Sequence, residues 1–194
     1  TPVERFIADL GLWNPGETVS GWPIVLTGNA AVRRRCLLQL GLFNDRLYTG
    51  ADVDLGWRIH KQLGQCVIHI PEALVRHKIY ATVPAMYRQF RRHGFGEILL
   101  DALHRKDSGY FRPAGVQLNR MLKQTLACLN YVRAFLIRSV LRVIGRCPRD
   151  RQIAAANWLV AEGGNLIGKL HGLWETRFFR MDPGLLDVED PGER

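Results

Sequence analysis

The spacing of apolar residues divides the chain into a first part with short elements and a second part with long helices. In the first part, short apolar runs between turn residues predict strands over residues 22–26, 66–70 and 74–77. Helical spacing predicts one helix from Ala30 to about Leu40, with Asn29 as its N-cap, and another from near Asp52 to Leu63. Each of these two helices is followed by a glycine, the residue that most often ends a helix.

Helical spacing continues over most of the second part, which begins at Val83. Gly94 and Gly96 are expected to break the first helix of this part. Residues 116–146 are predicted to form a long helix or a bent pair, and residues 151–175 a further helix. The chain therefore divides into three predicted regions, which are residues 1–83, a helical extension over 84–180, and a loose acidic tail over 181–194.

Composition excludes disorder over most of the length, because 47% of the 194 residues are hydrophobic. The four cysteines form no C-x-x-C pair, so neither a disulfide framework nor a structural zinc site is expected. Reduced thiols in the cytoplasm fit this usage better. The chain begins with Thr1 and shows no signal peptide, and we expect it to be a piece of a longer protein.

Positive charge is concentrated in one segment. The chain has a formal net charge of +9, and residues 84–150 alone contain thirteen Lys/Arg against four Asp/Glu. Such a segment favours an anionic partner, although a solvated helix face is an equal alternative. No nucleic-acid-binding motif is present, so nucleic acid is not an expected partner. The candidate partner is an anionic membrane surface, which would place the protein at the inner face of the cell membrane.

The predicted helix over residues 116–146 is basic and amphipathic. Four arginines fall on one side of a helical wheel, and the remaining positions are rich in Leu, Val, Ile and Phe; the four are Arg120, Arg138, Arg142 and Arg146. This pattern is typical of a helix that lies on an anionic membrane, and also of a helix packed on a domain. In the next helix, small residues recur at 156, 160, 164, 168 and 172, which predicts close helix packing or a membrane-surface hairpin.

Polar and glycine motifs are gathered between Thr27 and His77. They are Thr27-Gly28-Asn29, Gly41-Leu42-Phe43-Asn44, and Gly50-Ala51-Asp52-Val53-Asp54-Leu55-Gly56-Trp57-Arg58, followed by His77. This succession resembles the acceptor-side half of family 2 glycosyltransferases over roughly residues 20–100. The resemblance implies an α/β fold: a partial GT-A (Rossmann-like) acceptor half over residues 1–83, followed by a mainly α-helical C-terminal region.

The resemblance implies that Asp52 is the general base that takes the proton of an acceptor hydroxyl. The alternative is that Asp52 only caps a helix. Asp54 and Arg58, four residues apart on one helix face, are expected to form a supporting salt bridge. Asp52-Val53-Asp54 also has the letters of a D-x-D metal motif, but in the family that motif comes earlier. Ala51 stands where the family usually has a glutamate, which implies a lost supporting charge.

Further roles follow from the same resemblance. His77 matches a histidine that approaches a divalent cation, Mg²⁺ or Mn²⁺, whose other ligands would be mostly absent from this chain. The alternative interpretation is that His77 is a half-buried histidine at the end of a strand. Gly28 and Asn29 match substrate-binding positions. Gln89, Arg92 and His93 resemble the Q-x-x-R-W motif, with His93 in place of tryptophan, so that Arg92 would hold a diphosphate unless it belongs to a solvated basic face.

The expected function is therefore the transfer of a sugar from a nucleotide-sugar donor to an acceptor hydroxyl with inversion, on a cell-envelope glycan or lipid-linked acceptor. The donor-binding half of such an enzyme would be missing, because about twenty residues before Thr27 cannot form several βα units. The alternative is a non-catalytic, basic membrane-docking module derived from such an enzyme.

Overall fold

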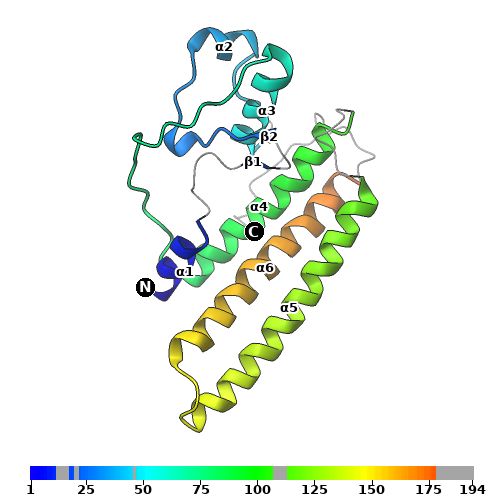
Figure 1. The fold of residues 1–194 in the computed structure, drawn as a ribbon. Coiled ribbons are helices and arrows are strands. Elements are labelled where there is room, and N and C mark those ends of the chain that lie inside the picture. Colours follow the sequence, from blue (N-terminus) through cyan, green and yellow to red (C-terminus); the bar gives the residue numbers. More distant parts are fainter. Residues whose placement is uncertain (12–17, 20–21, 46, 107–112, 178–194) are drawn as a thin grey trace.

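Helices dominate the computed structural model, which describes residues 1–11, 18–19, 22–45, 47–106 and 113–177 (Figure 1). The first part contains short elements: α1 (Pro2–Asp9), β1 (Thr18–Val19), β2 (Trp22–Pro23), the 3₁₀ turn η1 (Thr27–Asn29), α2 (Arg34–Gln39) and α3 (Ala51–Leu63). The second part contains three long helices: α4 (Val83–Leu103), α5 (Ala114–Val143) and α6 (Arg149–Glu175).

The expected α/β fold is wrong. Within the described residues the sheet consists of β1 and β2 alone, two antiparallel strands of two residues each. Of the three predicted strands, only Trp22–Pro23 is a strand, while residues 66–70 and 74–77 have no regular structure. A strand requires a neighbour for its main-chain groups, and no described strand lies beside these segments to provide one. A partial GT-A sheet is therefore not formed.

The three long helices form a layer with α6 in the middle (Figure 1), and α6 packs closely on α4. Glycines make this approach possible. A Cβ at Gly94 would overlap the Asn165 carbonyl, and one at Gly168 would overlap the Arg91 carbonyl. The prediction that Gly94 and Gly96 break the helix is wrong, because α4 runs through both. The predicted close packing at positions 164, 168 and 172 is confirmed.

The shorter elements lie against the other sides of α4. Near its start, Phe6 and Ile7 of α1 pack with Met86 and with Ala161 of α6. Near its end, Trp57 of α3 packs with Phe95 and other apolar residues of α4. The core cluster of Val25, Leu55 and Ile59 then joins α3 to the chain before η1. In this way α4 connects the helix layer to the region that contains most of the predicted site residues.

Helix ends follow the predictions in most places. α3 ends at Gly64, which adopts φ +59°, a left-handed conformation that favours glycine. α5 and α6 agree with the predicted helices over residues 116–146 and 151–175 within a few residues. α2 begins later than predicted, and its N-cap is Arg33 rather than Asn29, which belongs to η1.

The predicted acidic tail over 181–194 lies outside the described residues. No described helix is long and apolar enough to span a membrane.

Candidate functional site

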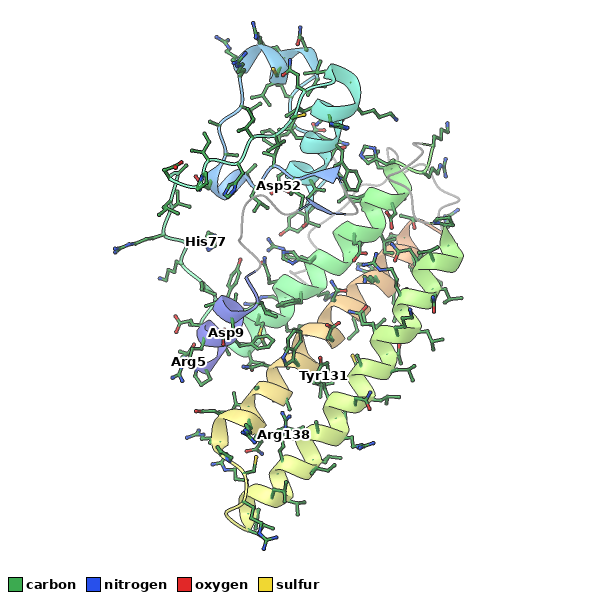
Figure 2. All side chains as sticks on the ribbon, in the orientation of Figure 1. Arg5, Asp9, Asp52, His77, Tyr131 and Arg138 are labelled. Carbon is green, nitrogen blue, oxygen red and sulfur yellow. The ribbon has the colours of Figure 1, made fainter. Side chains whose placement is uncertain are left out.

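Asp52 lies in the first turn of α3, with its side chain half-buried (Figure 2). The N-cap of α3 is Gly50, whose φ of +82° suits glycine, so Asp52 is not the cap. One carboxylate oxygen, Oδ1, accepts a hydrogen bond from the Val53 N–H at 3.0 Å. The other, Oδ2, accepts from the Thr27 hydroxyl at 3.4 Å.

The η1 turn joins Asp52 to the loop that contains His77. At one end of the turn, Thr27 donates to Asp52. In the middle, a Cβ at Gly28 would lie 3.9 Å from His77 Cδ2, so the imidazole lies beside this glycine. At the other end, the Asn29 amide donates to the Ala73 carbonyl at 2.6 Å. The turn therefore brings the predicted residues Gly28, Asn29 and His77 to the same side as Asp52.

The predicted residues of α4 face the same region. The Gln89 amide nitrogen lies 2.7 Å from His93 Nε2. Burial, and then the positive charge of Arg92, lower the pKa of His93, while the negative charge of Asp52 opposes that shift. Arg92 lies over the Tyr48 ring, 5.1 Å from its centroid, and its Nε has no hydrogen-bond partner among the described residues. Arg92 thus presents a buried N–H donor beside the Tyr48 ring and next to His93.

Asp54 has a structural position. Its side chain is 1% exposed, and it accepts a hydrogen bond from Arg58 Nε at 2.8 Å, as the spacing of four residues predicts. Arg58 also donates to the Leu40 and Leu42 carbonyls, which fixes the end of α2 against α3. The second Asp54 oxygen lies 2.8 Å from His104 Nε2, at the end of α4. Asp54 therefore joins three segments and points away from the face of Asp52.

His77 is the one predicted cation ligand among the described residues, and the cation itself stays a prediction. The described residues contain no group of three His, Cys, Asp or Glu side chains that could hold a metal ion. His77 is exposed on its loop, and a lone imidazole does not form a binding site for Mg²⁺ or Mn²⁺. We therefore derive no step through a cation.

A family comparison identifies the chain. The model described as "Glycosyl transferase family group 2" matches residues 11–161. The chain belongs to this family. The match is longer than the resemblance over residues 20–100, and it includes α4, α5 and the first part of α6. Searches of the curated proteins and of the solved structures gave no match. A family 2 glycosyltransferase domain supports glycosyl transfer as its general activity.

Three residues of this region were missed by the sequence reasoning. Thr27 stands in the quoted motif, but only the structure shows its contact with Asp52. Tyr48 stands four residues before Asp52 and pairs with Arg92 through its ring. His104 is fifty positions from Asp54, and no local pattern links the two. Only the packing of α3 on α4 creates these last two contacts.

Proposed function

We propose that this chain transfers a sugar from a nucleotide-sugar donor to an acceptor hydroxyl with inversion, and that Asp52 is the general base. The observation that supports this proposal best is the position of the Asp52 carboxylate. It is half-buried at the start of α3, held by the Thr27 hydroxyl of η1 and close enough to His93 of α4 for its charge to act on that imidazole. A carboxylate placed there can accept a proton from an alcohol within hydrogen-bond reach.

Asp52 takes the proton of the acceptor hydroxyl while the hydroxyl oxygen forms a bond to the anomeric carbon of the donor sugar. The bond from that carbon to the nucleoside diphosphate breaks on the opposite face, and the diphosphate leaves with the electron pair. The configuration at the anomeric carbon inverts. A single carboxylate suffices for this direct displacement, because no glycosyl-enzyme intermediate forms.

The α4 residues have roles that follow from their charge. Arg92 has a buried N–H group without a partner, and a guanidinium suits the oxygens of a leaving diphosphate. Its position over Tyr48 limits the directions in which it can move. His93 has a lowered pKa, so it is neutral at neutral pH and hydrogen-bonds with Gln89. We assign Gln89 and His93, with Gly28 and Asn29, to the binding of substrate hydroxyl groups.

An incomplete chain is part of the proposal. Residues 65–78 are exposed, although several of them are large and apolar; Ile68 is 81% exposed and Leu74 is 86% exposed. Apolar side chains in an extended segment are normally covered by a neighbouring element. We expect a donor-binding segment, absent from this sequence, to cover them and to supply most of the cation ligands. The 194-residue chain alone should then show little or no sugar transfer.

The test uses the chain joined to the sequence encoded directly upstream of Thr1. Asp52→Asn in this completed enzyme should lower the rate of sugar transfer by about a thousandfold or more, because the proton acceptor is lost. Binding of the nucleotide-sugar donor, measured by calorimetry, should remain nearly unchanged. Asp45→Asn, an exposed carboxylate outside the site, is the matched control and should retain full activity.

Retained turnover in Asp52→Asn would refute the general-base assignment. Sugar transfer by the isolated chain would refute the proposal that a donor-binding segment is missing. The alternative function, a non-catalytic docking module, is favoured by Ala51, which stands where the family usually has a glutamate. It predicts that even the completed protein neither binds a nucleotide-sugar nor transfers sugar.

A further inference from the structure

α5 exposes its apolar side to solvent. Leu122, Leu129, Leu136 and Val143 recur every seven residues and so lie in one stripe along the helix. With two neighbours they form what we call the outer ridge, whose members are between 58% and 88% exposed: Leu118, Leu122, Leu129, Leu136, Val140 and Val143. An amphipathic helix of a globular protein normally buries this side. A large exposed apolar stripe therefore indicates a surface that another apolar phase covers.

The inner side of α5 is held to α6 largely by polar contacts. Gln124 bonds with Glu162 and Asn165 of α6, and Gln152 of α6 donates to Ser139 at 2.8 Å. Tyr131 stacks on Trp158 of α6, with ring centroids 5.7 Å apart, and Arg138 donates to a carbonyl of α6 (Figure 2). These contacts fix the rotation of α5 about its axis. The outer ridge is therefore held facing away from the helix layer.

Arginines surround a pocket at the far end of the same helix. The pocket has a volume of about 470 Å³, and its lining residues lie on both sides of the turn between α5 and α6. That turn is at the bottom of Figure 1. Its lining includes Arg133, Arg138, Arg146 and Arg151, together with the apolar side chains of Ile137 and Leu141. None of these four arginines forms an ion pair with a described residue. Guanidinium groups without carboxylate partners are a recognition site for phosphate oxygens.

We infer that α5 is a docking helix for an anionic lipid bilayer, with the outer ridge among the acyl chains and the arginine pocket on the lipid phosphates. Over its 30 residues α5 is about 45 Å long, and it contains five Lys/Arg and no Asp/Glu. An amphipathic helix with such a positive charge lies flat at an anionic interface rather than spanning the bilayer. This inference requires neither Asp52 nor sugar transfer.

Charge decides between the possible occupants. A second copy of the chain could cover the outer ridge through the seven-residue repeat, but it would bring five further positive charges of α5 against the first five. A nucleic acid would satisfy the arginines but not six exposed aliphatic side chains, and base stacking requires exposed aromatic residues. The two aromatic residues of α5, Tyr131 and Phe135, are both at least partly buried. An anionic bilayer satisfies the charge and the apolar ridge together.

The experiment is co-flotation of the purified chain with lipid vesicles. One preparation contains equal parts of phosphatidylcholine and phosphatidylglycerol, and the other contains phosphatidylcholine alone. We expect binding to the anionic vesicles, at least about tenfold weaker binding to the neutral ones, and a loss of affinity as salt increases. Arg133→Gln/Arg146→Gln/Arg151→Gln should weaken anionic binding at least about tenfold. Leu129→Gln/Leu136→Gln should do the same.

Matched controls exist elsewhere on the surface. Arg33→Gln/Arg34→Gln/Arg35→Gln removes three exposed charges around α2, and Leu38→Gln/Leu74→Gln removes two exposed leucines, so both should bind as the unchanged chain does. Binding that is equal on both vesicles, or lowered as much by the controls, would overturn the inference. A dimer dissolved by Leu129→Gln/Leu136→Gln without vesicle binding would assign the ridge to a second copy. RNA binding lowered by the pocket variant, without vesicle binding, would assign the arginines to nucleic acid.

Discussion

The two sides of α4 are built differently. Toward α6, glycines at positions 94, 164, 168 and 172 bring the two backbones together, so that several carbonyls would overlap an added Cβ. Toward α3, large side chains such as Trp57 and Phe95 fill the space, and the buried contact between Asp54 and His104 closes it. The first interface depends on residues without side chains, and the second on side chains from distant parts of the sequence. Substitutions should therefore destabilise the first interface by overpacking and the second by removing buried contacts.

The largest effect is expected where α4 meets α6. Gly168→Leu would force the two backbones apart, because a Cβ at this position overlaps the Arg91 carbonyl. Overpacking of a well-packed interface should lower the free energy of unfolding by roughly 3 kcal/mol or more, measured by urea denaturation. Gly163→Ala is the matched control on α6, since nothing lies within 4 Å of its Cβ. It should stabilise the protein by about 0.5–1 kcal/mol. Equal effects from the two substitutions would contradict the close-packing account.

A slightly smaller effect is expected where α3 meets α4. Asp54→Ala leaves Arg58 and His104 without their shared carboxylate, at side-chain exposures of 14% and 8%. Breaking such a buried pair should lower the free energy of unfolding by roughly 3 kcal/mol. The control is Glu175→Ala, which removes an exposed carboxylate 3.3 Å from a histidine four residues earlier. An exposed pair contributes at most about 1 kcal/mol. If Asp54→Ala costs no more than the control, the pair does not hold α3 on α4.

The smallest effect depends on pH. The pKa of His93 lies below its ordinary value of 6.5, mainly because the side chain is buried. Below that ordinary value the unfolded chain binds the proton more readily than the folded chain, so acidification favours unfolding. The free energy of unfolding should fall as pH decreases below about 6.5, by at most about 1.4 kcal/mol for each pH unit, until the lowered pKa is reached. His93→Gln should remove this part of the pH dependence. An unchanged slope of the free energy of unfolding against pH, measured by urea denaturation, would show that His93 is not its cause.

The sequence predicted the long helices better than the region around the site. Helical spacing in α5 and α6 is a local property, and so is the glycine that ends α3. The strands predicted over 66–70 and 74–77 are apolar enough, but a strand forms only beside another strand, and the sequence does not contain that information locally. The glycines of α4 were misread as breaks for the same reason, because the residues they pack against are distant in the sequence: Asn165 for Gly94 and Thr49 for Gly96.

Part of the candidate site could be predicted from the sequence, and the rest depends on how the helices pack. The motif order alone placed Gly28, Asn29, Asp52 and His77 in one group, and the structure places them around η1. The i to i+4 spacing predicted the pair of Asp54 and Arg58. The contact of Asp54 with His104 depends on how α4 lies on α3, and no periodicity encodes that crossing. The roles of these residues in catalysis and binding stay predictions.

The η1 turn has a mechanical consequence. Its three residues link the α3 carboxylate at one end to the Ala73 loop at the other, through one hydrogen bond at each end. A displacement of that loop would stretch the hydrogen bond from the Asn29 side chain to the Ala73 carbonyl. It would also draw the Thr27 hydroxyl away from the Asp52 carboxylate. A partner that binds to this loop and displaces it would therefore also change the hydrogen bonding of the Asp52 carboxylate, without contacting it.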